Sequence, residues 1–384
     1  MTAFELATPA RIVFGAGKIA ETKSALGGAK RVLVVTGKSR RRADALEALL
    51  APAGIATIVF SVPKEPTVPL AREATALALA ERCDAVVAIG GGSALDAGKA
   101  IAALVANGGD PLDYLEVVGR GKPIEKPSLP FIAIPTTAGT GSEVTKNAVL
   151  AEPVAKVKAS LRSPFMLPRV AIIDPELLLG APKEVLASSG LDALSQVIEP
   201  FLSARRNPIT DAIAREGIVR SARSLRRAVL EENGPSERED LALASLCGGL
   251  CLANSGLGAV HGFAAPIGGS FEAPHGAVCA ALHPAVLEVN LAALKARDAS
   301  SPVIARFDEL ARMVTGNANA RADEGIAFLT QLVRDLDVPG LARYGMKDTD
   351  VPEVAAKAKV ASSMKANAIA LTDEELETIA RRSL

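Results

Sequence analysis

Residues 84–106, DAVVAIGGGSALDAGKAIAALVA, place an apolar run, three glycines and a helical pattern in direct succession. Ala85–Ile89 is short, apolar and rich in valine and isoleucine, which predicts a buried strand. Ser93–Ala106 repeats its apolar residues at helical spacing, so a helix should begin as soon as the glycines end. A strand that passes through glycines into a helix is the first half of a unit that builds a parallel sheet.

The same alternation of strand and helix extends through the first half of the chain. The further strands expected are Arg31–Thr36, Ala56–Phe60, Phe131–Pro135 and Val170–Asp174, with helices at about 41–50 and 69–83. From Lys183 onward no run alternates with a period of two, and helical patterns broken by Gly and Pro follow one another. We therefore expect an α/β domain with a parallel sheet over residues 1–181 and an all-helical domain over 182–384.

The composition is typical of a cytoplasmic enzyme. The 384 residues exceed one ordinary core, which favours two domains. Lys and Arg total 43, as do Asp and Glu, so the charge indicates neither a nucleic-acid partner nor an anionic membrane. No signal-peptide pattern opens the chain, and apolar stretches such as Ala100–Ala106 are too short to span a bilayer. The cysteines form no CxxC pair and are typical of small buried residues in a reducing compartment: Cys83, Cys247, Cys251 and Cys279.

The glycine turn Gly90–Gly92 suits a pyrophosphate. Glycine lets a phosphate approach the backbone, and the start of a helix offers unpaired N–H groups and a favourable dipole. The turn lacks the GxGxxG spacing of the common dinucleotide fingerprint. Ser93 and Asp96 also fit an S-x-x-D capping box, so a tight turn with a good helix cap is the alternative interpretation.

A second segment, PTTAGTGSEVT at Pro135–Thr145, follows the strand that begins at Phe131. Its hydroxyls and glycines contribute little to a core. At the carboxyl end of a strand such groups suit contacts with ribose and phosphate. A structured loop of Ser and Thr turns is the alternative.

Together the two segments resemble the hallmarks of the iron-containing (group III) alcohol dehydrogenase family, GGGSxxDxxK and PTTxGTGSEVT. The matching residues are GGGSALDAGK at Gly90–Lys99 and PTTAGTGSEVT at Pro135–Thr145, and FGAG at Phe14–Gly17 also fits in order. The resemblance implies an NAD(P)-dependent dehydrogenase assisted by a divalent metal, and a homo-oligomer. It also implies cofactor contacts from Gly91, Gly92, Ser93, Asp96, Thr136, Thr137, Thr140, Ser142 and Lys158.

Two histidines and a carboxylate in the second half could bind the metal. Asp192 and Gln196 lie four residues apart and share one helix face, while His261 and His275 flank a glycine-rich break. A carboxylate with imidazoles suits a divalent transition metal, although such residues are more often ordinary core or capping groups. His283 has no counterpart in the family's metal pattern, and we interpret it as structural.

The family usually binds its metal through Asp, a His four residues later, a His in HGxxH and a His in PHG. Asp192, His261 and His275 match this pattern, and the resemblance makes them the expected catalytic residues and ligands. Gln196 stands where the family has His, and Ala265 replaces the last His of HGxxH, often assigned a proton relay. An amide oxygen is a weaker ligand than imidazole, so we expect Fe²⁺ or Zn²⁺ to bind weakly with a minor contribution from Gln196.

The expected chemistry is hydride transfer between an alcohol and the nicotinamide, with the metal polarising the substrate oxygen. The substrate would be a small alcohol, aldehyde or ketone. NAD-preferring relatives often place an Asp after the second strand, where this chain has Gly37. Lys38, Ser39 and Arg40 follow, so we expect NADP(H) to be accepted through contacts with its 2′-phosphate.

Three other interpretations stay open. Maleylacetate reductases resemble the same family, but they usually carry TTYAGSEVT where this chain has TTAGTGSEVT. A lyase like dehydroquinate synthase would need Lys and Arg near the metal, and Gly256–Ala277 contains neither. A noncatalytic nucleotide-binding relative could have lost its metal through Gln196 and Ala265. Metal content and turnover of simple alcohols would separate these classes.

Overall fold

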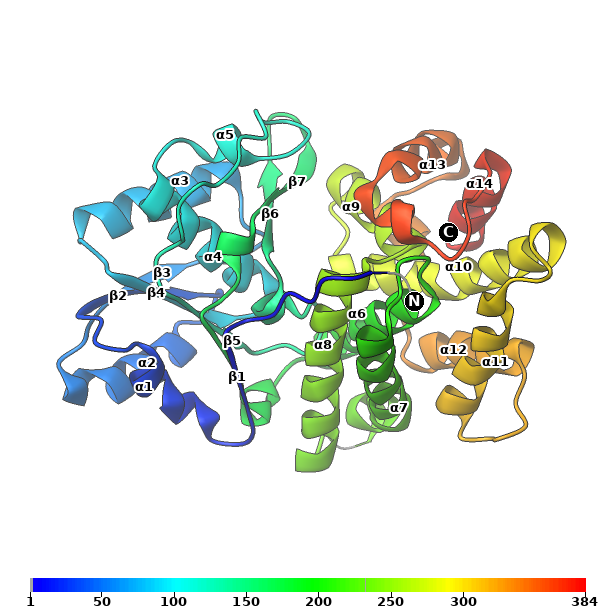
Figure 1. Ribbon diagram of the computed structural model, residues 1–384, viewed down its shortest axis with the longest axis horizontal. Helices are drawn as coiled ribbons and strands as arrows, with labels where there is room; N and C mark the ends of the chain where they lie inside the picture. The colour runs from blue at the N-terminus through cyan, green and yellow to red at the C-terminus, as the bar shows by residue number, and fades with distance from the viewer. Residues whose placement is uncertain (1–2, 232) are drawn as a thin grey trace. The chain divides into compact units, whose positions relative to one another are not determined.

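The computed structural model describes residues 3–231 and 233–384 (Figure 1). The chain divides into two compact units. The α/β unit consists of Ala7–Thr137 and Gly141–Leu179. The helical unit consists of Ala138–Thr140 and Gly180–Leu384, together with a short N-terminal stretch that ends at Leu6. The short segment 138–140, in the middle of the hydroxyl-rich motif, therefore groups with the helical unit.

The α/β unit contains a six-stranded parallel sheet in the order β1-β8-β5-β4-β2-β3. Its strands are β1 (Arg11–Phe14), β2 (Arg31–Thr36), β3 (Ala56–Ser61), β4 (Ala85–Gly90), β5 (Phe131–Pro135) and β8 (Val170–Ile173). Its helices are α1 (Thr22–Ala25), α2 (Arg41–Leu50), α3 (Val68–Ala80), α4 (Gly92–Asn107) and α5 (Pro111–Tyr114). The predicted parallel α/β architecture is confirmed, and all five predicted strands belong to this sheet.

The sheet is buried on both faces because helices cover each side (Figure 1). In β2, Leu33 and Val35 pack in the cluster formed with α3 and α4. Val32 and Val34 point the opposite way and pack against α2. This arrangement explains the continuous apolar runs that predicted the strands, since each face of a parallel sheet needs its own apolar residues.

Two strand features of the α/β unit were not predicted. One is the edge strand β1, whose four residues are too few for a clear pattern. The other is an antiparallel hairpin of β6 (Asn147–Glu152) and β7 (Val157–Arg162). Its buried residues alternate along both strands and pack in one cluster with α4: Ala148, Leu150, Ala159 and Leu161. The signal was therefore present, but alanines on the buried face weakened the alternation.

The helical unit confirms the predicted all-helical second half. Its main helices are α6 (Lys183–Leu202), α7 (Pro208–Leu230), α8 (Pro235–Ser255), α9 (Ala259–Phe271), α10 (His275–Arg297), α11 (Pro302–Thr315), α12 (Ala322–Asp335), α13 (Val351–Val360) and α14 (Asp373–Arg382). Within the described residues every strand ends by Ile173. The helix α10 is long and apolar enough to cross a bilayer by composition, but 78% of its most apolar window is buried here. That burial is typical of a core helix.

The helix α6 is the central element of the helical unit. Every residue from Gly190 to Leu202 is buried, and α6 packs against α7, α8 and α10. Four of these buried residues are polar and must find partners inside the protein: Asp192, Ser195, Gln196 and Glu199.

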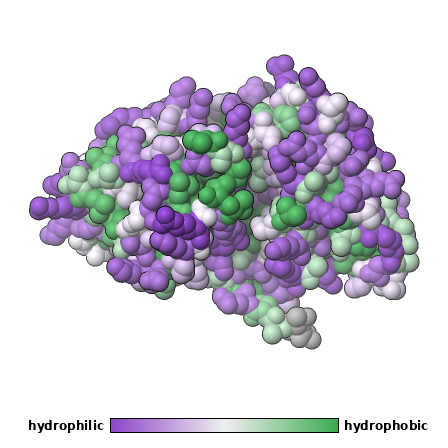
Figure 2. All heavy atoms as spheres, turned by 90° about the horizontal axis from the view of Figure 1, so that it is seen from above, coloured by the Kyte–Doolittle hydropathy of each residue, from purple (hydrophilic) through white to green (hydrophobic). Residues whose placement is uncertain are grey.

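On the molecular surface, polar residues cover most of the face drawn in Figure 2, with hydrophobic ones in scattered groups, as is usual for a folded protein.

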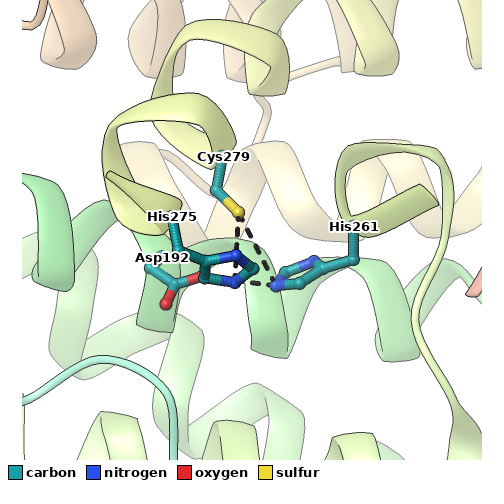
Figure 3. Close-up of side chains that lie close together, drawn as sticks. All are labelled: Asp192, His261, His275 and Cys279. Carbon is teal, nitrogen blue, oxygen red and sulfur yellow. Dashed lines mark hydrogen bonds and ion pairs between the residues drawn. The ribbon is translucent and has the colours of Figure 1, made fainter. Parts of the chain in front are cut away.

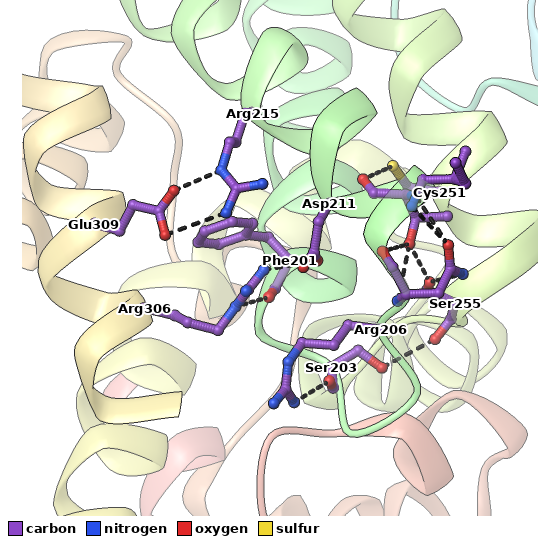
Figure 4. A network of polar contacts seen from close by, with 12 residues as sticks. Phe201, Ser203, Arg206, Asp211, Arg215, Cys251, Ser255, Arg306 and Glu309 are labelled. Atoms are coloured by element: carbon purple, nitrogen blue, oxygen red, sulfur yellow. Dashed lines mark hydrogen bonds and ion pairs between the residues drawn. The ribbon is translucent and has the colours of Figure 1, made fainter. Parts of the chain in front are cut away.

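Arginines from two other helices anchor the C-terminal end of α6 (Figure 4). The Arg306 guanidinium carbon lies 3.9 Å from the centroid of the Phe201 ring, and that of Arg215 lies 5.3 Å from it. Arg306 also donates to the Phe201 carbonyl (2.8 Å) and to Asp211 (2.7 Å). Cation–π contacts of this kind contribute about 0.5–2 kcal/mol each. They fix the helix that carries the candidate site.

Gly98 should be indispensable to packing in the α/β unit. A Cβ at this position would lie 2.8 Å from both Ala88 Cβ and Phe131 Cε2, so α4 approaches the sheet only because glycine is there. We expect Gly98→Ala to destabilise the protein by about 1–3 kcal/mol, measured by denaturant unfolding. Gly37→Ala is the control, because its Cβ would meet nothing within 4 Å, and its effect should stay below about 0.5 kcal/mol. Equal effects of the two substitutions would contradict this account.

Candidate functional site

Four side chains that can bind a metal converge in the helical unit (Figure 3): Asp192, His261, His275 and Cys279. Their ligand atoms all lie within 4.8 Å of one another. His261 Nε2 lies 3.2 Å from Asp192 Oδ1, and His275 Nε2 lies 3.7 Å from the same oxygen. Cys279 Sγ lies 3.8 Å from His261 Nε2 and 3.7 Å from His275 Nε2. The structure thus brings together the three residues expected from the sequence and adds Cys279.

Three helices position this cluster. Asp192 comes from α6 and His261 from α9, while His275 and Cys279 lie one turn apart on α10. The start of α10 lies very close to α6, because a Cβ on Gly276 would be 2.6 Å from the Ser188 carbonyl oxygen. Glycine after His275 therefore allows the imidazole to reach Asp192. The His275 side chain is 41% exposed, whereas those of Asp192 and His261 are buried, so the site opens on the side of His275.

Glu199 orients His261 by binding the ring nitrogen on the side away from Asp192. Its carboxylate accepts hydrogen bonds from His261 Nδ1 (2.6 Å) and from the Val260 backbone N–H (2.7 Å). A carboxylate only accepts, so Nδ1 donates to Glu199, and Nε2 is the ring nitrogen that faces Asp192 and Cys279. A carboxylate behind a histidine is the usual outer partner of a metal-binding imidazole. Glu199 was not predicted as a site residue. The available signal in the sequence was a carboxylate seven residues after Asp192 on the same predicted helix.

The charges in the cluster favour a cation. Burial opposes a charged His261, yet the Cys279 sulfur and the hydrogen bonds with Asp192 and Glu199 raise its pKa well above the usual value. The Cys279 sulfur, and then Asp192, raise the pKa of His275 to about 9. Burial acts to raise the pKa of Asp192, but the two histidines lower it below its usual value. A carboxylate oxygen and a cysteine sulfur beside two imidazoles form a donor set suited to a divalent transition metal.

Gln196 lies one helical turn from Asp192 and is buried. Its Nε2 donates to the Gly139 carbonyl at 2.9 Å. Its Oε1 has no hydrogen-bond partner among the described residues, and a buried acceptor without a partner is destabilising. Because Gln196 follows Asp192 by one helical turn, a cation bound at the cluster is one partner that could satisfy this oxygen.

His283 has the structural surroundings that we expected. It is buried, and its Nδ1 lies 3.0 Å from Ser195 Oγ, which itself donates to the Leu191 carbonyl. Burial lowers the pKa of His283 to about 3. This imidazole is therefore neutral and belongs to the packing of α10 against α6.

In the α/β unit, the alternative interpretation of Ser93 and Asp96 as a capping box at the start of α4 is wrong. The N-cap of α4 is Gly91, with no side-chain hydrogen bond to the cap. Asp96 instead accepts from Ser142 Oγ (2.5 Å) and from the Val149 backbone N–H (2.9 Å). These tertiary partners, close in space but distant in sequence, displace the local cap. The helix start is left without a side-chain cap, as an anion-binding helix N-terminus requires.

The remaining predicted cofactor residues lie on several elements. The Thr136 N–H donates to the Gly90 carbonyl (2.9 Å), and a Cβ on Gly91 would lie 3.3 Å from Thr137 Oγ1, so these residues gather where β4 and β5 end. Lys158, on β7, pairs with Glu65 at 2.6 Å. Gly37 and Ser39 follow β2, Gly92 and Ser93 open α4, and Thr140 groups with the helical unit.

Lys99, at the end of the glycine motif, joins this motif to the hydroxyl-rich motif Pro135–Thr145 through hydrogen bonds. Its side chain is fully buried, and Nζ donates to the Ser142 carbonyl (3.0 Å) and to Thr145 Oγ1 (2.8 Å). Nζ also lies 3.2 Å from Asp96 Oδ1, although burial lowers the pKa of the lysine. Lys99 and Asp96 therefore hold the second motif in place rather than facing solvent.

Known proteins resemble this chain along most of its length. Residues 9–175 match the family described as "Iron-containing alcohol dehydrogenase", and residues 186–384 match "Fe-containing alcohol dehydrogenase family, C-terminal". The chain is 34% identical over 377 residues to 1,3-propanediol dehydrogenase from Klebsiella pneumoniae, covering 95% and 94% of the two chains. It is 33% identical to NAD-dependent methanol dehydrogenase from Bacillus methanolicus, covering 98% of each. A crystal structure of 1,3-propanediol oxidoreductase superposes with a TM-score of 0.92 at 33% identity, covering 100% of both chains.

Removing the charge of Glu199 should weaken metal binding without unfolding the protein. Glu199→Gln loses the anionic acceptor that fixes His261, so we expect about 10–100-fold lower affinity for Zn²⁺, measured by competition with a chelator. Glu184→Gln, in the exposed first turn of the same helix, is the matched control and should leave the affinity unchanged. An unaltered affinity in Glu199→Gln would show that this hydrogen bond does not orient a ligand.

Proposed function

This chain belongs to the iron-containing alcohol dehydrogenase family, and we propose that it interconverts small alcohols and their aldehydes or ketones at the cluster in its helical unit. It is an oxidoreductase that uses NAD(P) and a divalent metal. The observation that carries the proposal is the convergence of Asp192, His261 and His275 with their ligand atoms toward one point. The alcohol substrates named for the relatives support the substrate class.

We propose that Asp192, His261 and His275 hold the metal, with Gln196 contributing weakly through its amide oxygen. A divalent metal bound there would act as a Lewis acid on the substrate oxygen and favour the alkoxide over the alcohol. Asp192 supplies a negative charge, and Glu199 binds Nδ1 of His261, so that Nε2 is the ring nitrogen directed to the metal. The partly exposed His275 marks the side from which a small substrate would enter.

We assign cofactor binding to the α/β unit, with residues 1–181 as the dinucleotide-binding domain and 182–384 as the metal and substrate domain. The start of α4, at Gly91, Gly92 and Ser93, would receive the pyrophosphate, because it lacks a side-chain cap. Thr136 and Thr137 lie beside this turn and would contact the cofactor. For Thr140, Ser142, Asp96 and Lys158 the proposed contacts rest on the family resemblance.

The segment after β2 supports acceptance of NADP(H). Gly37 leaves this place without the carboxylate that would repel a 2′-phosphate. Among the basic residues that follow, Arg40 pairs with Asp44 and Glu47, and Arg42 donates to Thr136 and to the Leu177 carbonyl. The exposed Lys38 and Ser39 are therefore the better candidates for a 2′-phosphate.

We also propose that the enzyme works in the cytoplasm as a homo-oligomer, without nucleic-acid or membrane partners. All four cysteines are free and buried, as expected in a reducing compartment.

Activity should depend on the metal. Wild-type protein of measured metal content should oxidise simple alcohols, such as methanol or 1,3-propanediol, with NAD⁺ or NADP⁺. Treatment with a chelator should abolish turnover, and added Zn²⁺ or Fe²⁺ should restore it, because the bound metal is the proposed Lewis acid that stabilises the alkoxide. Undiminished turnover by rigorously metal-free enzyme would defeat the proposal.

Cofactor preference should respond to one carboxylate at position 37. Wild-type kcat/KM with NADPH should lie within about tenfold of that with NADH, or above it. Gly37→Asp should lower the ratio of NADPH to NADH efficiency by about tenfold or more, because the new charge repels the 2′-phosphate. Gly37→Ala adds bulk without charge and serves as the control. A wild-type enzyme that strongly prefers NADH would contradict the proposal.

A further inference from the structure

We propose that the Cys279 sulfur is a further protein ligand of the metal beside Asp192, His261 and His275, a stronger donor than the amide of Gln196, and that the site consequently takes Zn²⁺ in preference to Fe²⁺. This inference rests on the proposed function, since it concerns the same metal. No sequence pattern distinguishes Cys279 from the other cysteines. The structure separates it by its contacts with both histidines of the cluster (Figure 3).

The spacing of the donor atoms fits a four-ligand zinc site. Zinc bonds of about 2.3 Å to sulfur and about 2.0–2.1 Å to nitrogen or oxygen, at tetrahedral angles, separate ligand atoms by about 3.3–3.6 Å. In the cluster the sulfur lies 3.8 Å from His261 Nε2 and 3.7 Å from His275 Nε2. Asp192 Oδ1 lies 3.2 Å and 3.7 Å from the same two nitrogens. Small side-chain movements would bring all four atoms onto one ion.

The charge of the set also matches a divalent ion. Asp192 is buried, and its charge needs compensation inside the protein. A cysteine binds zinc as the thiolate. A thiolate and a carboxylate carry two negative charges, which one Zn²⁺ neutralises. Gln196 is neutral, and its Nε2 is held by the Gly139 carbonyl, so it adds no charge to the set.

The other cysteines lie in different surroundings. Burial raises the pKa of Cys83 to about 11 and that of Cys247 to about 12, and it raises the pKa of Cys251 well above the usual value. Cys251 Sγ lies 3.5 Å from the Thr210 carbonyl, to which it donates. These three are therefore small buried thiols, and Cys247 on α8 is a suitable control for Cys279.

The choice of metal follows from the sulfur. Thiolate is a soft ligand that favours zinc over the harder Fe²⁺, and zinc also binds more tightly than Fe²⁺ to most nitrogen and oxygen sites. A histidine at position 196 would have supplied a nitrogen from α6. This chain would instead draw its fourth strong donor from α10, one turn after His275.

X-ray absorption at the zinc edge of the purified, zinc-loaded wild-type enzyme tests the ligand directly. We expect one sulfur scatterer at about 2.3 Å together with nitrogen and oxygen at about 2.0–2.1 Å. A first shell of nitrogen and oxygen alone would overturn the proposal. The measurement uses unmodified protein, so it does not depend on a variant that folds.

Cobalt substitution supplies a second test. Co²⁺ bound to a thiolate gives an intense near-ultraviolet charge-transfer absorption, which we expect in wild-type protein and in Cys247→Ser but not in Cys279→Ser. Loading with equal Zn²⁺ and Fe²⁺ without oxygen should give mostly zinc in wild-type protein. Cys279→Ser should bind Zn²⁺ about 10–100-fold more weakly than wild type. Absorption that persists in Cys279→Ser, or preferential iron loading of the wild type, would overturn the inference.

Turnover of alcohols by the same zinc-loaded samples separates the two proposals. Turnover without a sulfur ligand defeats the Cys279 assignment and leaves the dehydrogenase function standing. A sulfur ligand without turnover of any alcohol keeps the ligand assignment and defeats the proposed function.

Discussion

Two carboxylates buried on one helix, Asp192 and Glu199 of α6, must find partners to offset their lost hydration, and much of the helical unit is arranged to provide them. His261 lies between the two, with one ring nitrogen toward each. The backbone of α9 joins them as well, since the Val260 N–H also donates to Glu199. The same pairing that stabilises two buried charges therefore fixes the orientation of an imidazole. The contacts that stabilise the fold here are the same contacts that position His261 in the site.

The site also requires that backbone segments of the helical unit lie very close together. Gly276 lets the start of α10 lie against α6, and Gly139 lies against Ser189, where a Cβ would be 2.9 Å from the serine Cβ. Gln196 binds the Gly139 carbonyl, so the hydroxyl-rich segment 138–140 is joined to the metal-site helix within the helical unit. Glycine has the same effect in the α/β unit, where Gly98 allows α4 to pack directly on the sheet. Small residues here set distances between elements rather than providing flexibility.

Features that show as repeating patterns in the sequence could be predicted well. Features that depend on contacts between residues far apart in the sequence could not. The central strands were predictable because valine and isoleucine run continuously through β2 and β4. The family motifs pointed to Asp192, His261 and His275, which the structure brings together. Glu199 and Cys279 escaped because their surroundings exist only after three helices pack. The capping box failed for the same reason, since Asp96 turns to Ser142 and Val149, which lie far away in the sequence.

The cluster assembled from α6, α9 and α10 has a thermodynamic consequence. Asp192, His261 and Cys279 come from separate helices and meet only in the native fold, so the unfolded chain offers an ion at most fragments of the site, such as the neighbouring pair His275 and Cys279. An ion that binds the native state alone shifts the folding equilibrium toward that state in proportion to the logarithm of its free concentration. The stability of this protein is thus partly a property of its medium. A cell that restricts metal supply would lower the amount of folded enzyme together with the activity of each molecule.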